Sequence, residues 1–274
     1  MGTVKAMRRA GIIVIPVIIV LILCATSPFI WMIMASFKKN ADILNPDRML
    51  LFDPTLKNYI SVFTTYSLIK PIMNSILISV ISTVVACVFG LPTAYAIARW
   101  KMNFFASIIL VIRIIPAISY LVPWHIMFAQ MKLSGTYTAL VLAYTLSSLP
   151  LIIWIMIPYF SMIPKELEQS AVIDGSSLIG SFARIVLPLS MPGILTSAIL
   201  ALIFAWNNFL YALVLSGKNT GTLPMAIFNF ISYTKIEWGG LMAATVVITL
   251  PIIVISLLLQ KYVVSGLTAG AVKG

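Results

Sequence analysis

Six apolar runs, each longer than 20 residues, limit what this chain can fold into. They lie at about 11–35, 71–97, 104–128, 137–160, 191–215 and 239–260. A helix needs about 20 mostly apolar residues to cross a bilayer, and the runs lack the alternating pattern of β-barrel strands. With 61% hydrophobic and 9% charged residues, the composition is also far from that of soluble proteins. The sequence therefore predicts an all-α integral membrane protein with six transmembrane helices.

The first run follows three basic residues, Lys5, Arg8 and Arg9, as the apolar core of a signal peptide would. It is longer than the usual 7–15 residues of such a core, so we expect an uncleaved first span. The flanking charges do not settle orientation, because nine Lys and Arg residues fall on the side of the N-terminus and eight on the other. Prolines within most of the runs predict kinked helices, which either surround a pathway or improve packing.

All seven acidic residues lie outside the six runs, and they are Asp42, Asp47, Asp53, Glu166, Glu168, Asp174 and Glu237. Ion-driven carriers commonly use intramembrane acids as ligands or proton relays. The sequence also lacks a GxxxxGK[ST] phosphate-binding loop. Neither catalytic nor metal-ligating clusters are evident, and we expect no catalytic residue and no metal ligand. Uphill transport by this chain would therefore need energy from a partner.

A polar segment, residues 161–190, connects the fourth and fifth runs. Pro164 and Glu166 are typical of a helix start, and Gly175 favours a break between two helices. Ser176 or Ser177 can cap a second short helix, which would present Leu178, Phe182 and Ile185 on one face. Such a face either fills a groove of another protein or lies on the lipid surface.

The same segment carries a recognisable motif. It reads Gln169-Ser170-Ala171, then three residues, Gly175, nine residues, and Ile185-x-Leu187-Pro188. This spacing resembles the EAA loop of permease subunits of binding-protein-dependent ABC importers, although Gln169 and Ser170 replace the usual Glu and Ala. The stretches 52–59 and 260–274 are similar to the maltose-type carbohydrate branch of that family.

The resemblance implies a type I ABC importer permease architecture in the bacterial or archaeal inner membrane. A coupling helix, about 176–183, would dock in an ATP-hydrolysing subunit, with this loop and both termini in the cytoplasm. Residues 1–70 would form the first helix and an outer segment, residues 71–262 a five-helix core, and residues 263–274 a tail that either reaches between the ATPase subunits or frays. The residues that the resemblance assigns to ATPase coupling are Glu168, Gln169, Ala171, Asp174, Gly175, Ser177, Leu178, Phe182, Arg184, Leu187 and Pro188.

The implied partners are a second permease subunit, two ATP-binding subunits and an extracytoplasmic sugar-binding protein. ATP and Mg²⁺ would bind in the partner subunits, and this chain would bind no cofactor. The implied function is import of a sugar through a pathway that this chain half encloses. The alternatives are a stand-alone channel, an ion-coupled carrier, or a membrane scaffold subunit that conducts nothing.

Two groups of polar or aromatic residues inside the runs are candidates for contact with the substrate. Arg113 lies in the third run, where an uncompensated cation is costly, so it lines a polar pathway or pairs with carbonyls or a partner chain. Trp206, Asn207, Asn208 and Phe209 combine amides with aromatic faces, as sugar sites do. Hydrogen bonds between helices are an equally good explanation of the two Asn residues.

Overall fold

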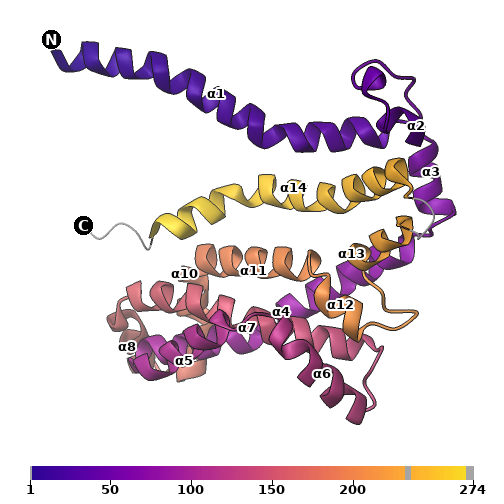
Figure 1. The fold of residues 1–274 in the computed structure, drawn as a ribbon. Helices are drawn as coiled ribbons and strands as arrows, with labels where there is room; N and C mark the ends of the chain where they lie inside the picture. Colours follow the sequence, from indigo (N-terminus) through magenta and orange to yellow (C-terminus); the bar gives the residue numbers. More distant parts are fainter. Residues whose placement is uncertain (1, 232–235, 270–274) are drawn as a thin grey trace. The chain divides into compact units, whose positions relative to one another are not determined.

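The structure is a computed structural model that describes residues 2–231 and 236–269 (Figure 1). Residues 232–235 and residues 270–274 of the expected tail lie outside the described part. Residues 263–269 of that tail continue the last helix.

The described residues form helices, with two isolated β-bridges and no β-strand. The elements are α1 (Gly2–Ser36), α2 (Asn40–Ile43), η1 (Pro46–Arg48), α3 (Lys57–Thr64), α4 (Ile69–Arg99), α5 (Asn103–Ile114), α6 (Ile118–Gln130), α7 (Tyr137–Met162), α8 (Lys165–Ile173), α9 (Leu178–Ser181), η2 (Phe182–Val186), α10 (Leu187–Leu189), α11 (Met191–Trp206), α12 (Leu210–Leu215), α13 (Leu223–Ala226), η3 (Ile227–Phe230) and α14 (Trp238–Ala269). The expected all-α class is confirmed for this part of the chain.

Four of these helices, α1, α4, α7 and α14, are each long and apolar enough to cross a membrane over described residues. Two bent pairs, α5 with α6 and the 178–189 segment with α11, raise the number to six when each pair is one span. The expected helices at 71–97 and 137–160 are confirmed as α4 and α7.

The third expected span, 104–128, is not one continuous helix. It breaks between α5 and α6, whose axes differ by 94°. Pro116 causes the break, because a proline lacks a backbone N–H and disfavours helical geometry in the residue before it. Ile115 is accordingly extended, with φ −65° and ψ 125°. The hydroxyl of Tyr120 lies 2.8 Å from the carbonyl oxygen of Ile112 and 2.9 Å from that of Ile115, so it satisfies carbonyls that the break exposes.

The fifth expected span, 191–215, is also interrupted. The helix α11 ends at Trp206, and α12 resumes at Leu210. The Asn208 side chain accepts a hydrogen bond from the backbone N–H of Tyr211 at 3.1 Å. This bond satisfies a donor in the first turn of α12, in the way that Asn favours helix starts over helix interiors.

The chain divides into two compact units. One contains residues 1–67 and 227–250, and the other contains residues 68–226 and 251–274. The division expected from the sequence, with a five-helix core at residues 71–262, stays a prediction.

In the first unit, Lys38 is fully buried and organises residues 44–53. Its Nζ donates to the carbonyl oxygens of Arg48 (3.0 Å) and Met49 (2.6 Å). The same ammonium lies 4.7 Å from the ring centre of Trp31 and 4.6 Å from that of Phe52. Carbonyl acceptors and aromatic faces together stabilise a cation away from water.

In the second unit, α4 and α7 pack along each other and α11 packs against both (Figure 1). Small polar residues face one another at these contacts. The Thr145 hydroxyl, for example, donates to the carbonyl oxygen of Ser82 at 3.3 Å. Small side chains let membrane helices approach closely. Gly193 of α11 illustrates this approach, since a Cβ there would lie 2.6 Å from the Tyr159 ring of α7.

Candidate functional site

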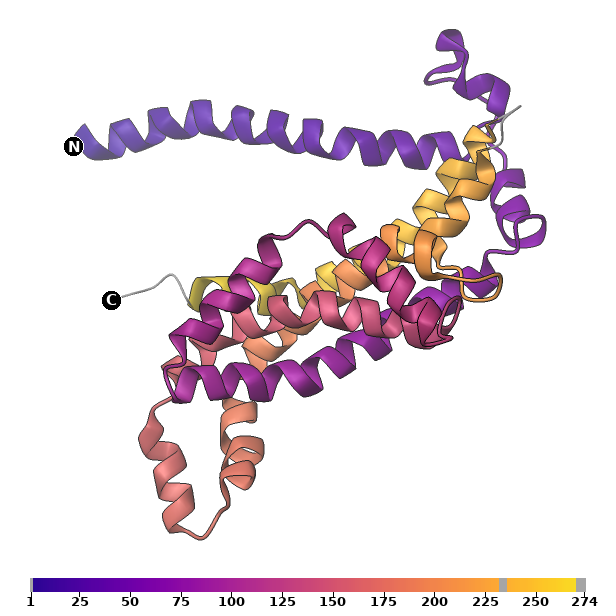
Figure 2. The same cartoon turned by 60° about the horizontal axis from the view of Figure 1, so that its bottom comes forward.

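The 161–190 segment projects from the helix bundle of its unit as a hairpin of short helices (Figure 2). Its two ends continue into α7 and α11. The first short helix, α8, begins at Lys165 directly after Pro164 and has Glu166 and Glu168 in its first turn. The helix start expected from the sequence is confirmed.

The turn at the tip of this hairpin also follows the sequence. Gly175 has φ +88°, a left-handed conformation that other residues adopt only with strain. Ser177, rather than Ser176, caps α9, since its hydroxyl accepts from the N–H of Gly180 at 3.1 Å.

After α9 the chain forms a π-helical turn, η2, instead of continuing as a regular α-helix. The N–H of Leu187 donates to the carbonyl oxygen of Phe182, five residues back. Pro188 follows at once and has no N–H to donate to the carbonyl oxygen of Arg184. We attribute the wide turn to this proline, because its ring would also crowd that carbonyl in a regular helix.

The expected apolar face of the second helix needs correction. The Phe182 ring turns toward the bundle, with its centre 4.7 Å from that of Tyr95 and 6.1 Å from that of Phe160. Leu178 stays exposed, and Ile185 is partly buried. Phe182 therefore anchors the hairpin within its own chain, because its aromatic neighbours bury it there.

The exposed apolar side chains gather instead around the tip. Ile173 and Ile179 are 85% and 80% exposed, and Val172 and Leu178 are 45% and 64% exposed. These four residues come from the end of α8 and the start of α9, on either side of Gly175. We call them the apolar tip. A cluster of exposed large apolar residues at the end of a projection is typical of a surface that binds a partner.

Glu168, which the sequence assigned to ATPase coupling, is buried. Its carboxylate forms an ion pair with Arg99, at the end of α4, and accepts a hydrogen bond from the hydroxyl of Tyr95. Arg99 Nη1 also donates to the carbonyl oxygen of Ile163 at 3.0 Å. Two buried charges that satisfy each other in this way avoid the cost of an isolated buried ion. Glu168 thus joins α8 to α4, and its role in ATPase coupling stays a prediction.

The remaining residues that the sequence assigned to coupling divide by exposure. Ala171, Phe182 and Leu187 are partly buried. The exposed members are Gln169, Asp174, Gly175, Ser177, Leu178, Arg184 and Pro188. The role of these exposed residues stays a prediction.

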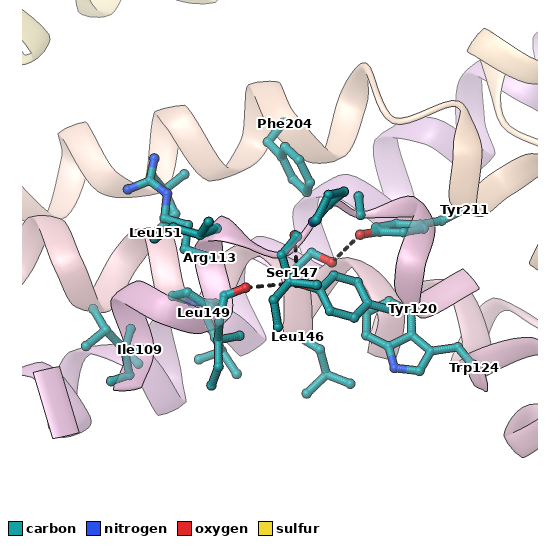
Figure 3. Close-up of a pocket in the computed structure, with 17 residues that line it drawn as sticks. Ile109, Arg113, Tyr120, Trp124, Leu146, Ser147, Leu149, Leu151, Phe204 and Tyr211 are labelled. Carbon is teal, nitrogen blue, oxygen red and sulfur yellow. Dashed lines mark hydrogen bonds between the residues drawn. The ribbon is translucent and has the colours of Figure 1, made fainter. Parts of the chain in front are cut away.

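A cavity of about 730 Å³ lies among α5, α6, α7, α11 and α12 (Figure 3). Tyr120, Trp124 and Tyr211 form an aromatic wall. The Tyr120 and Trp124 rings stack at 5.5 Å between centres, and those of Trp124 and Tyr211 lie 5.4 Å apart. Ser147 also lines the cavity and donates to the hydroxyl oxygen of Tyr211 at 2.8 Å.

Arg113 is the one charged residue among those that line this cavity. In Figure 3 its guanidinium points away from the aromatic wall. The cavity therefore offers aromatic faces and hydroxyls on one side and a cation at its edge. Carbohydrates are bound by such combinations, because ring faces contact C–H surfaces and polar groups bind hydroxyls.

The other expected pathway residues do not line the cavity. Trp206 is buried and Phe209 is partly buried. The Asn207 amide donates to the carbonyl oxygen of Ile203 at 3.0 Å, and Asn208 bonds the start of α12. Both Asn side chains thus serve their own segment in this structure, and a role for these four residues in transport stays a prediction.

Sequence reasoning missed Tyr120, Trp124 and Ser147 as lining residues. A signal was present, since Tyr120 and Trp124 are four residues apart after Pro116 and so share one face of a helix. What could not be anticipated was the bend that turns this face toward α7.

Comparisons with known proteins concern the family and the fold of the chain. A family profile described as "Binding-protein-dependent transport system inner membrane component" matches residues 86–269. The trehalose/maltose transport system permease protein MalG of Thermococcus litoralis is 38% identical over 272 residues, which cover 96% of each chain. The trehalose transport system permease protein SugB of Mycobacterium tuberculosis is 36% identical, over 91% of this chain and 93% of its own.

Among solved structures, a chain of a bacterial ABC transporter involved in the import of the acidic polysaccharide alginate superposes with a TM-score of 0.80. The alignment covers 94% of this chain and 98% of that chain at 19% identity. This similarity confirms the expected permease fold.

Proposed function

Because the chain belongs to the family of binding-protein-dependent transport system inner membrane components, we propose that it is a membrane-spanning permease subunit of an ATP-driven sugar importer. In this proposal it encloses half of a translocation pathway and converts ATPase closure into alternating access. The observation that carries the proposal is the apolar tip, a partner-binding surface at the end of the one segment whose motif resembles the EAA loop.

The sugar class is supported by the relatives and by the cavity. Permeases named for trehalose and maltose match almost the whole chain. A volume of about 730 Å³ falls within the range of roughly 300–1,000 Å³ usual for small-molecule sites. We infer that the Tyr120 and Trp124 rings contact sugar faces and that Ser147 and Arg113 bind hydroxyls.

The coupling step follows from the shape of the hairpin. The apolar tip would fill a groove in an ATP-binding subunit, in the way that amphipathic helices dock in apolar grooves. Movement of that subunit on ATP binding would displace α8 and α9. The displacement would reach the bundle because Phe182 and Glu168 attach these two helices to it. Rigid-body motion of this kind is a common way to switch a pathway between its two openings.

The rest of the assembly is inferred from this function. A second permease subunit would complete the pathway, two subunits would bind ATP and Mg²⁺, and an extracytoplasmic protein would deliver the sugar. The hairpin and both termini would then lie in the cytoplasm, and residues 36–70 and 216–238 on the opposite side.

Replacing Ile179 by Asp tests the docking. Ile179 is 80% exposed, so the change leaves the fold of this chain intact. A central interface residue contributes about 2 kcal/mol, so binding of the ATP-binding subunit should weaken roughly 30-fold. The assay is co-purification of the ATP-binding subunit together with ATP-dependent sugar uptake. Ile179→Val, which keeps the apolar contact, is the matched control.

Unchanged co-purification and uptake in Ile179→Asp would count against the docking surface. Sugar uptake by the purified chain alone, driven by a sodium or proton gradient, would instead favour an ion-coupled carrier. Arg113→Gln tests the cavity, since loss of uptake at normal abundance places this residue in the pathway and normal uptake removes it.

A further inference from the structure

Two polar clusters lie at opposite ends of α4. The Arg99 cluster, at the C-terminal end, consists of Tyr95, Arg99, Ile163 and Glu168. Its ion pair and hydrogen bonds fix the start of α8 to α4. Arg99 and Glu168 are both buried, so water does not screen the attraction between them.

The Asn74 cluster, near the N-terminal end of α4, holds a different loop. The Asn74 amide donates to the carbonyl oxygens of Asn219 (3.0 Å) and Gly221 (2.9 Å). Ser75 accepts from the N–H of Leu223 at 2.8 Å, and Lys70 Nζ donates to the Asn219 side chain at 2.6 Å. Asn74 and Ser75 are buried. The 216–223 loop is thereby attached to α4 through backbone groups as well as side chains.

One uninterrupted helix connects the two clusters. α4 runs from Ile69 to Arg99 with Pro92 inside it, and 25 residues at 1.5 Å each place Asn74 and Arg99 about 38 Å apart. The helix packs closely on α7 at Gly90, since a Cβ on this glycine would lie 3.1 Å from Ile152. Because dense packing transmits strain, this contact beside Pro92 lets a displacement of one end of α4 reach the other end.

We propose that α4 transmits movement of the 161–190 hairpin to the 216–223 loop, with Arg99 and Asn74 as the positioning residues at its two ends. The inference rests on the proposed function, because it assigns the ATP-driven step to one helix. Displacing the hairpin displaces Glu168, and the buried Arg99 follows since separating the pair would leave two unpaired charges. The Asn74 cluster then carries the 216–223 loop in step.

The experiment compares hydrogen exchange in the assembled transporter with and without Mg²⁺, ATP and vanadate. In the wild type we expect the nucleotide to change exchange in α8 and α9 and in residues 216–226. In Glu168→Gln the response of residues 216–226 should fall roughly 5-fold or more, the usual lower end of coupling between sites. Glu166→Gln, on the exposed face of the same helix turn, is the matched control and should respond as the wild type does.

Two further variants keep the inference testable where Glu168→Gln does not assemble. Tyr95→Phe removes one hydrogen bond to Glu168 and leaves the ion pair, so it should weaken the response partly. Arg99→Lys keeps a cation beside Glu168, so residues 216–226 should retain most of their response. A purely structural role would not produce this graded order at a loop about 38 Å away.

The outcomes separate the two proposals. If the nucleotide does not change hydrogen exchange in α8 and α9 of the wild type, the proposed function is refuted and this inference with it. The link through α4 is refuted if α8 and α9 respond in the wild type but residues 216–226 do not. It is also refuted if residues 216–226 respond in Glu168→Gln and Tyr95→Phe as strongly as in the wild type. In both cases the docking of the hairpin stands.

Discussion

The close approach of α11 to α7 at Gly193 gives a quantitative prediction. A Cβ added to Gly193 would lie 2.6–2.7 Å from three ring carbons of Tyr159, namely Cγ, Cδ1 and Cδ2. These atoms include the base of the ring, so a small rotation of the side chain does not relieve the clash. Gly193→Ala must therefore separate the two helices at the point where the 161–190 hairpin leaves and rejoins the bundle.

The expected cost comes from two opposing terms. Overpacking a dense contact costs about 1–3 kcal/mol. Replacing glycine by alanine within a helix recovers up to about 1 kcal/mol. With the full recovery subtracted, the net destabilisation should be about 0–2 kcal/mol, which is a factor of up to roughly 30 in the folding equilibrium.

A double-mutant cycle with Tyr159→Ala isolates the clash. In that background no ring opposes the new methyl group, so Gly193→Ala should become neutral or stabilising by up to about 1 kcal/mol. The measurement is the free energy of unfolding of the chain in bicelles by steric trapping, with thermal unfolding in detergent as a check. A cost that is equal in both backgrounds, or a wild-type background in which Gly193→Ala stabilises the protein, would refute the reasoning.

Three further predictions concern single side chains. Ser177→Ala should destabilise α9 by about 1 kcal/mol through loss of its cap, seen as faster hydrogen exchange of the Gly180 amide, whereas Ser176→Ala should leave that amide unchanged. Gly175→Ala should cost about 1–2 kcal/mol of backbone strain alone, because φ is +88° and nothing lies within 4 Å of the new Cβ. A midpoint of thermal unfolding equal to that of the wild type would contradict this prediction. Lys38→Met should leave the Arg48 and Met49 carbonyls without their donor and cost about 1–3 kcal/mol, measured as faster proteolysis within residues 44–53.

Much of the helical architecture could be predicted from the sequence, because local patterns determine it. Long apolar runs became α4 and α7, and the Pro164, Gly175 and Ser177 signals marked the boundaries of the short helices. These features depend on backbone geometry within a few residues, so no knowledge of distant neighbours was needed.

The direction of individual side chains could not be predicted in the same way. Glu168 carries a carboxylate in the motif assigned to ATPase coupling, yet this carboxylate is buried in an ion pair with Arg99, 69 positions earlier in the chain. Phe182 turns toward Tyr95 and Phe160 for the same reason. In both cases a contact between residues far apart in sequence determined the outcome, and a helical pattern carries no information about it.

The cavity was the least predictable feature. Its aromatic wall joins Tyr120 and Trp124 of α6 to Tyr211 of α12. Pro116 signalled a kink, but a proline does not specify a bend of 94° or its direction. Those depend on how α5 and α6 pack on the rest of their unit.

The Tyr120 hydroxyl has a consequence for how this protein is made. It lies within hydrogen-bond distance of the Ile112 and Ile115 carbonyls, both in the same stretch of chain. Backbone oxygens freed by a break in a membrane helix must find a donor before lipid surrounds them. Here the donor arrives only a few residues behind the acceptors during synthesis. The bend therefore supplies its own donor for these two carbonyls and needs none from a distant segment of the chain.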